Sequence, residues 1–168
     1  MNDLSQRRIR EMPAHASHSK QSLRLWLRLL ACTSAIEKNV RQRFKDDFET
    51  TLPRFDVLAI LDWASDTLTM GELTERLMVS NGNTTGVVKR LEREGLVERF
   101  SSPDDRRTFY VRLTGKGKTS FAKMASAHES WIDDACNSLN ADEIGIMLQQ
   151  LAALKESIEV DQSRGGKR

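Results

Sequence analysis

A chain of 168 residues, 39% hydrophobic and 30% charged, has the composition of a folded globular protein with one sizeable core. Its net charge of +2 is too small for a protein that coats nucleic acid without regard to sequence. The longest apolar stretch, Leu23 to Cys32, is interrupted by Arg24 and Arg28, so it is not expected to span a bilayer. The start carries no signal-peptide pattern and the two cysteines lie far apart, which together predict a cytoplasmic protein.

The first part of the chain predicts an arm and a long helix. Residues 1–18 show no sustained periodicity and are expected to form a mobile arm ahead of a single domain over 19–168. A helix of about 45 Å is predicted over 19–48, which is too long for one small domain to cover, so part of it is expected to meet a second subunit. Apolar residues at four-residue steps indicate this helix: Ile36, Val40, Phe44 and Phe48.

Helix-start and helix-stop residues then divide the chain into shorter helices. Pro53 suits the first turn of a helix over about 52–65. Thr69, with a glutamate three positions on, is a capping box that opens a short helix. Ser80 is expected to begin the next helix, which ends at Gly95, a favoured residue after a helix.

The pattern changes from helical to alternating after Gly95. Residues 96–102 and 108–113 are predicted to be strands, joined by a polar turn over 101–107. Two helices, a short link and a charged hairpin in this order are typical of a winged helix-turn-helix. The expected fold is therefore mainly α with a small β-wing, and its DNA-binding region spans 52–114.

Two further helices are predicted to close the chain. One spans about 115–137, and the other opens at Asn140, where Glu143 completes a second capping box. Because one chain of this size cannot cover all of its apolar stripes, the helices of 19–48 and 115–160 are expected to form a dimer interface. The last helix carries a clean apolar stripe: Ile144, Met147, Leu148, Leu151, Leu154 and Ile158.

The helix that begins at Ser80 carries the main evidence for DNA binding. At about 100° per residue, its outward line holds two glycines and two basic residues, opposite Thr84, Val88 and Leu91. Each glycine costs roughly 1 kcal/mol of helix stability relative to alanine, and a groove that admits the backbone closely would explain that cost. An ordinary solvated face with two accidental glycines is the alternative. The predicted DNA contacts here are Asn81, Gly82, Asn83, Thr85, Gly86, Lys89, Arg90 and Arg93.

The tip of the hairpin is a second candidate for DNA contact. Arg106 and Arg107 at an exposed turn suit the narrow, negative minor groove, and Asp105 would hold their side chains. A solvated charged turn is the alternative reading of this tip.

The segment from Leu68 to Gly117 resembles the DNA-binding core of the MarR (multiple antibiotic resistance regulator) family. The resemblance is carried by the runs RLEREGLVER, PDDRR and VRLTGKG, and it covers about residues 20–158. It implies a homodimer, a pseudo-palindromic operator and repression relieved by a small ligand. Its Asp-x-Arg wing motif falls on Asp105 and Arg107. Many members carry arginine where this chain has Gly86, so their base contact does not transfer there.

The resemblance also implies an effector pocket between the dimerisation helices and the winged region. Arg24 and Arg28, one turn apart, would meet an acid or phosphate group. The run VSNGNTTG resembles regulators of aromatic-acid catabolism, some of which answer to hydroxycinnamoyl-CoA thioesters. This favours an aromatic acid or an aryl-CoA thioester as effector. The alternative is that the aromatic residues are core and the arginines solvated. From their approximate positions on the predicted helices, the following residues are expected to line the pocket: Arg24, Trp26, Arg28, Leu30, Phe55 and Trp131.

The cysteine and histidine residues do not indicate a catalytic or metal-binding site. Cys32 and Cys136 are expected to be buried, inert thiols. His15 and His18 lack a third ligand, so neither a metal nor a cofactor is expected. No nucleophile–base set or phosphate-binding loop is visible, which argues against an enzyme.

Two other functions compete with a sequence-specific repressor. A winged domain used only for protein–protein assembly should have apolar residues on its outward helix face, whereas this face holds glycine, lysine and arginine. A sequence-independent architectural DNA binder should be far more basic than +2. The expected partners are therefore duplex operator DNA, a second copy of the chain and a small effector, with no membrane.

Overall fold

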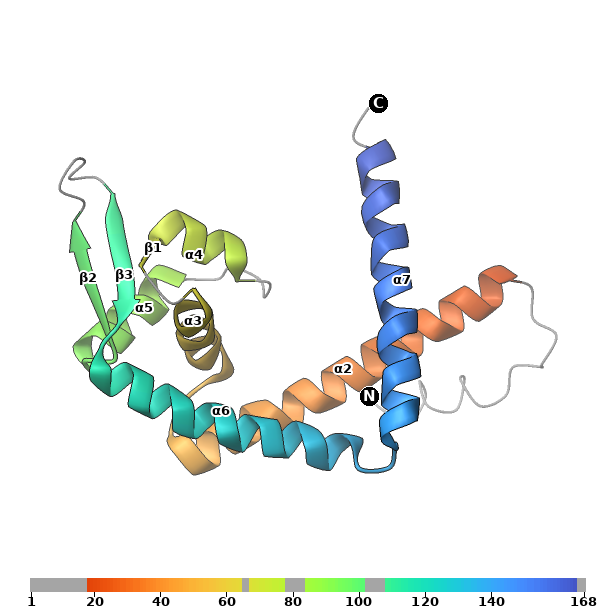
Figure 1. Ribbon diagram of the computed structural model, residues 1–168, viewed down its shortest axis with the longest axis horizontal. Coiled ribbons are helices and arrows are strands. Elements are labelled where there is room, and N and C mark those ends of the chain that lie inside the picture. Colours follow the sequence, from red (N-terminus) through yellow and green to blue (C-terminus); the bar gives the residue numbers. More distant parts are fainter. Residues whose placement is uncertain (1–17, 65–66, 78–83, 102–107, 166–168) are drawn as a thin grey trace. The chain divides into compact units, whose positions relative to one another are not determined.

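The computed structural model describes residues 18–64, 67–77, 84–101 and 108–165, with side chains as far as Val160. It divides into two compact units, one ending at His128 and one beginning at Glu129, each described by itself below. No helix in these described stretches is long and apolar enough to cross a membrane. The elements follow in chain order (Figure 1): α2 (His18–Phe48), α3 (Leu52–Trp63), β1 (Leu68–Thr69), α4 (Met70–Arg76), α5 (Thr84–Arg93), β2 (Val97–Ser101), β3 (Phe109–Leu113), α6 (Gly115–Cys136) and α7 (Ala141–Gly165).

The helices α2 and α3 confirm the helices predicted over 19–48 and 52–65, whereas the arm predicted over 1–18 lies, apart from His18, outside the described residues. Helix α2 ends at Phe48, and Glu49 adopts the left-handed backbone (φ 49°) that commonly terminates a helix. The amide of Thr50 then donates to the carbonyl of Phe44 at 3.1 Å. Helix α3 follows at once with a proline in its first turn, where the missing N–H costs nothing.

Helix α4 opens with the predicted capping box. The hydroxyl of Thr69 accepts from the amide of Glu72 at 3.1 Å, and the Glu72 carboxylate accepts from the amide of Thr69 at 2.8 Å. The same segment also forms β1, which the sequence did not predict. Leu68 pairs with Val111 and Thr69 with Tyr110, so the antiparallel sheet has the order β1–β3–β2.

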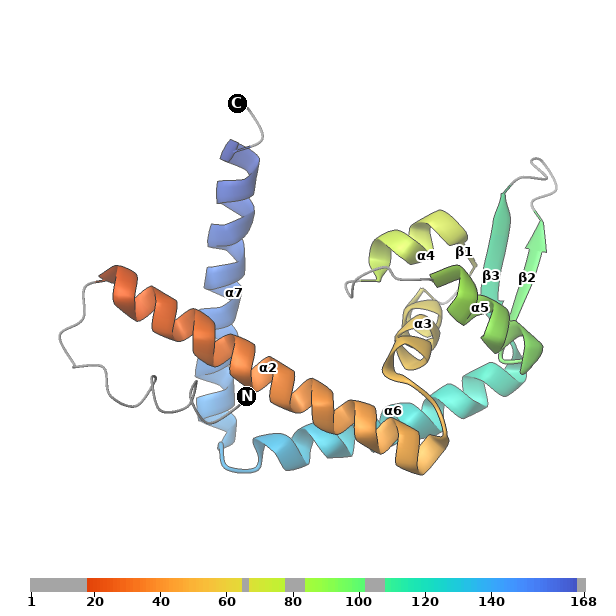
Figure 2. The ribbon, with the colours of Figure 1, turned by 180° about the vertical axis from the view of Figure 1, so that it is seen from behind.

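The core of the first unit lies between α3, α4, α5 and the sheet. Helix α3 packs on α4, α5 and β3, while α5 also packs on β2, as the view from behind shows (Figure 2). Each of these helices and the sheet contributes side chains to the core. The following are at most 2% exposed: Val57, Leu58, Leu73, Val88, Leu91, Val97 and Val111. This core positions α5 relative to the hairpin.

An aromatic cluster joins α2 and α3 to the part of α6 that belongs to the first unit. The ring of Phe55 lies 4.7 Å from Phe44, 5.5 Å from Phe121 and 5.0 Å from His128, measured between centroids. Burial lowers the pKa of His128, because a charged imidazole is disfavoured among these rings. The cluster is therefore apolar packing that favours the neutral form of His128.

Helix α6 begins in backbone contact with the base of the hairpin. The Thr114 hydroxyl caps the helix by accepting from the amide of Gly117 at 2.9 Å. A Cβ atom at Gly117 would lie 1.9 Å from the carbonyl oxygen of Leu96. Only glycine can occupy this position, since the obstacle is backbone and cannot rotate away.

The second unit contains the end of α6 and all of α7. The predicted capping box is present: the amide of Glu143 donates to Asn140 Oδ1 at 3.0 Å, and the amide of Asn140 donates to the Glu143 carboxylate at 2.9 Å. The apolar stripe of α7 is largely exposed, with Leu148 at 63% and Leu151 at 41%. Within the described part of this unit, only Ile144 and Leu154 of the stripe are partly covered.

Candidate DNA-binding surface

The orientation of α5 follows from which of its side chains the core takes in. Thr84, Val88 and Leu91 are buried against α3 and the sheet, as the spacing predicted. Gly95 follows with φ +70°, a conformation that glycine adopts without strain, and it ends the helix at the predicted position. The predicted start at Ser80 lies outside the described residues.

The outward face of α5 carries hydroxyl and basic side chains. Thr85, Lys89, Arg90 and Arg93 are all exposed. Gly86 is half-buried, although helix geometry sets it nearly opposite Val88. This arrangement offers cations and a hydrogen-bonding hydroxyl on one side of a helix that is held firmly from the other. Several predicted contacts lie outside the described residues: Asn81, Gly82, Asn83, Asp105, Arg106 and Arg107.

The C-terminal end of α5 is anchored by residues that the sequence analysis did not single out. Arg54 of α3 forms an ion pair with Glu94, just after the helix. Lys116 of α6 donates to the Glu94 carbonyl at 2.7 Å, and the Thr114 hydroxyl donates to the Gly95 carbonyl at 2.7 Å. Arg54 and Glu94 are 40 positions apart, so no local spacing pattern could have revealed their contact. These bonds give partners to backbone carbonyl groups at the end of α5 that have none within the helix.

The stem of the hairpin is stiffened by stacked aromatic and basic side chains. On one face, Arg112 bonds Glu98 at 2.5 Å and lies 5.2 Å from the ring of Phe100, which packs on Tyr110. Phe109 is 36% exposed although it shares a strand face with buried Val111, because the stem leaves the core at that point. These contacts hold β2 and β3 together as far as the pair Ser101 and Phe109.

The predicted ligand residues differ in burial and are divided between the two units. Phe55 is buried in the aromatic cluster described above. Trp26, Arg28 and Leu30 are exposed along α2, and Arg24 there is half-buried. Trp131 is buried, but it belongs to the second unit.

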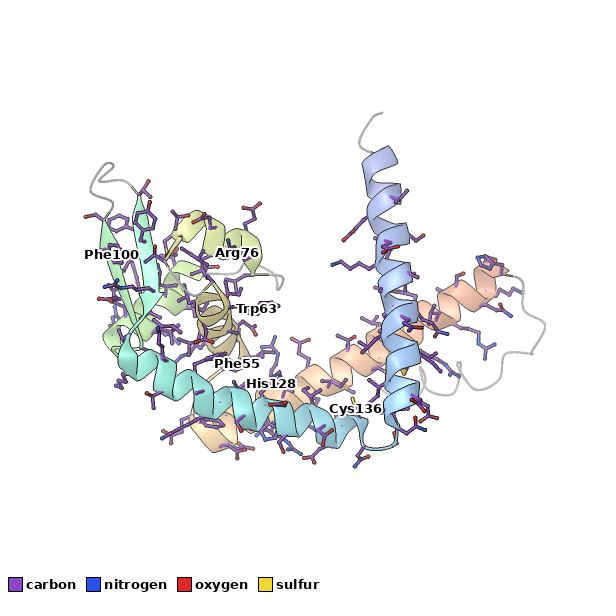
Figure 3. The ribbon with its side chains drawn as sticks, in the orientation of Figure 1. Phe55, Trp63, Arg76, Phe100, His128 and Cys136 are labelled. Carbon is purple, nitrogen blue, oxygen red and sulfur yellow. The ribbon has the colours of Figure 1, made fainter. Side chains whose placement is uncertain are left out.

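A pocket that the sequence analysis missed lies between α3 and the end of α4. Its volume is about 460 Å³. Its signal in the sequence is a second stripe on α3, at the spacing i, i+3, i+4, i+7 from Asp56 to Trp63. Figure 3 labels Trp63 and Arg76, two of its lining residues. The lining residues are Asp56, Ala59, Ile60, Trp63, Ala64, Arg76 and Leu77.

The acidic residue of this pocket has a perturbed pKa. Burial raises the pKa of Asp56 to about 6 from 3.8; Arg41 opposes the rise and Glu37 adds to it. Across the described stretches, the Asp56 carboxylate has no hydrogen bond or ion pair, since Arg41 bonds Glu37 instead.

The cysteines differ from the expectation of buried, inert thiols. Cys32 is exposed on α2, and Cys136 is half-buried at the end of α6. Helix α2 has little packed against its N-terminal half in the first unit, which explains the exposure of Cys32. The expectation was therefore wrong for the burial of Cys32.

Comparison with known proteins gives a consistent set of relatives. The MarR family model matches residues 50–109. The uncharacterized HTH-type transcriptional regulator YkoM of Bacillus subtilis is 32% identical over 113 residues, which are 67% of this chain and 71% of YkoM. A solved MarR family transcriptional regulator from Silicibacter pomeroyi is 28% identical with a TM-score of 0.73, over 85% of this chain and 99% of that one. A mutant MarR from E. coli complexed with operator DNA has the same fold, with a TM-score of 0.69 at 22% identity over 83% and 99% of the two chains.

Proposed function

Because the chain belongs to the MarR family of transcriptional regulators, we propose that it is a repressor that binds a pseudo-palindromic operator as a homodimer. It is a transcriptional regulator and not an enzyme. The observation that carries the proposal is the exposed line of Thr85, Lys89 and Arg93 on a helix whose other face is buried. An assembly module would present apolar side chains there, and this helix does not.

The helix α5 enters the major groove in this proposal. Thr85 and Asn83 reach base edges, Gly82 and Gly86 allow close approach, and the basic residues bond guanine or phosphate. Asn81 and Arg90 contact the same groove from beside the outward line. At the wing, Arg106 and Arg107 enter the minor groove with Asp105 holding them. The operator-bound MarR structure supports this placement by its common fold.

The dimer is proposed from the uncovered apolar residues of the long helices. Leu23, Trp26 and Leu30 on α2 are 55%, 56% and 47% exposed, and α7 has the exposed stripe described above. A stable monomer rarely exposes so much contiguous apolar surface. A two-fold dimer would cover both helices and set two copies of α5 on successive half-sites.

The effector is proposed to be an aromatic acid or its CoA thioester, received by Arg24 and Arg28 together with aromatic residues of the dimer helices. A relative with the same fold, BpsR of Bordetella bronchiseptica, is regulated by 6-hydroxynicotinic acid. Titrating the operator complex with aromatic acids and aryl-CoA thioesters tests this class. Release by none of them would exclude it.

The DNA-binding proposal is tested with one lysine on α5 and one elsewhere. Lys89→Ala should weaken binding to the chain's own upstream DNA and reduce the slope of log K against log salt by about 1, since one phosphate contact is lost. Lys123→Ala, an exposed lysine on α6, is the matched control and should change neither quantity. Equal behaviour of the two variants in anisotropy titrations would exclude α5 as the DNA contact.

The dimer is tested with neighbouring substitutions on α7. Leu151→Asp should shift the sedimenting species from dimer to monomer, because a charge would be buried in an apolar interface. Gln150→Asp introduces the same charge one position away and should leave the dimer intact. A parent protein that sediments as a monomer at micromolar concentration would refute the proposal directly.

A further inference from the structure

The end of α5 is joined to two other parts of the first unit by bonds of fixed direction. Arg54 of α3 forms an ion pair with Glu94, the residue that follows α5. Lys116, in the first turn of α6, donates to the Glu94 carbonyl at 2.7 Å. Thr114, just before α6, donates to the Gly95 carbonyl at 2.7 Å. The side chain of Arg54 is the only contribution of α3 to this set of bonds, as far as the structure describes the chain.

Arg54 occupies a position that its own helix does not favour. It lies in the first turn of α3, where the helix dipole disfavours a positive charge. Its side chain is only 16% exposed, and its Nε is buried without a hydrogen-bond partner among the described residues. Both features cost free energy, and an ion pair with the 45% exposed Glu94 offsets little of that cost. A residue that breaks local rules in this way is expected to have a role other than stability.

The inward face of α5 sets the position of the helix more closely than its tilt. Val88 and Leu91 are fully buried, but apolar contacts are non-directional. A helix of ten residues is about 15 Å long, so a tilt of about 10° shifts one end by about 2–3 Å. Hydrogen bonds to base edges weaken steeply over a smaller distance than this. A directional bond at the end of α5 therefore decides whether its outward side chains match a particular base sequence.

We propose that Arg54 is a positioning residue for sequence recognition, whose ion pair with Glu94 holds α5 at the tilt that matches the operator. The inference rests on the DNA-binding function proposed above. Arg54 lies on α3 and contacts no base in this proposal, so its effect reaches the DNA through Glu94 and α5. A different role would be to neutralise the Glu94 carboxylate, which would otherwise repel the phosphates of every duplex alike.

The first experiment compares the chain's own upstream DNA with a scrambled duplex of the same length and composition. Arg54→Met removes the charge and keeps a long side chain. It should lower the ratio of the two affinities about tenfold, which is the discrimination that one good base contact supplies. Affinity for the scrambled duplex should fall much less, because phosphate contacts do not require an exact tilt. An equal loss on both duplexes would assign Arg54 to charge neutralisation and overturn the proposal.

Stability measurements separate a positioning role from a merely structural one. Arg54→Met should leave the free energy of unfolding unchanged or raised, since it removes a cation from a helix start and an unpartnered buried N–H. Arg41→Met, which breaks an ion pair within α2, is the matched control and should leave the affinity ratio unchanged. A loss of the ratio in Arg54→Met that appears only together with a loss of stability would refute the positioning role.

A double-mutant cycle tests whether Arg54 acts through Glu94. Glu94→Gln keeps the size of the side chain and should lower the affinity ratio as much as Arg54→Met does. The double variant should lose no more than either single variant, because each already breaks the same ion pair. Additive losses would show that the two residues act independently and that the inference is wrong.

Hydrogen exchange without DNA distinguishes a failure of this inference from a failure of the proposed function. The amides of Glu94, Gly95 and Leu96 donate to backbone carbonyls at the end of α5, at 2.9 to 3.1 Å. Arg54→Met should accelerate their exchange severalfold while the amides of β3 keep the rates of the parent. Unchanged exchange at these three amides would overturn the inference, whatever the protein does on DNA. A parent that binds both duplexes equally would instead refute the repressor proposal, and with it the recognition role of Arg54.

Discussion

The winged core and the long helices differ in how far they bury their apolar side chains. In the core, Leu73 and Leu91 are completely buried by residues of the same chain. On α7, Leu148 is 63% exposed and Ile158 is 49% exposed, although their spacing is as regular as that of any core helix. The difference teaches that the winged core buries its apolar side chains within one chain, whereas the stripe of α7 stays exposed, which is the basis of the proposed dimer.

The largest expected effect comes from truncating a leucine in each region. Leu91→Ala should reduce the free energy of unfolding by about 2–5 kcal/mol, because it opens a cavity in a rigid core. The loss of stability caused by Leu148→Ala should depend on protein concentration, because the substitution lowers the free energy of unfolding only where the dimer forms. Urea denaturation at two protein concentrations measures both. A loss from Leu148→Ala that is the same at every concentration would break the comparison.

The two capping boxes provide a second, smaller test. Thr69→Ala should cost about 1 kcal/mol of global stability, since α4 belongs to the cooperative core. Asn140→Ala removes an equivalent cap from α7 and should mainly accelerate amide hydrogen exchange in the first turns of that helix. Exchange that speeds up throughout the winged core in Asn140→Ala would show that the two regions unfold as one.

A third test of the comparison is a pH dependence that Asp56 should give to the winged region. Burial raises its pKa to about 6 in the folded chain from 3.8, so the folded state holds the proton more tightly than the unfolded state. Stability from this group is therefore present below about pH 4 and is lost as the pH rises to about 6. Asp56→Asn should match the parent at the acidic end and be the more stable protein above pH 6. A constant difference across this range would contradict the assignment, and Asp62→Asn is the control.

Local signals account for what could be predicted from the sequence. The capping boxes at Thr69 and Asn140 and the stop at Gly95 each depend on residues within one turn, so their positions were readable. The inward face of α5 followed from helical spacing alone. The strand β1 was missed because Leu68 has a partner, Val111, that only the folded chain brings near.

Residues that meet across the fold were beyond sequence reasoning. Phe55 was expected at an effector pocket, yet its contacts with Phe44 and Phe121 show that it packs in the core. An aromatic residue that lines a pocket and one that packs in the core have the same spacing in the sequence, so the sequence does not distinguish them. Trp63 was overlooked because only the folded structure distinguishes which stripe of α3 is buried and which remains open.

The contact at Gly117 has a consequence for how such sequences vary. The closing run VRLTGKG contains two glycines, and a Cβ would meet nothing within 4 Å at Gly115 but would strike the Leu96 backbone at Gly117. The first can be exchanged among relatives, whereas the second can be replaced only if the hairpin and α6 separate. A library of random substitutions over this run should therefore retain glycine at 117 and lose it freely at 115. Searches for distant relatives would gain by weighting the two positions unequally.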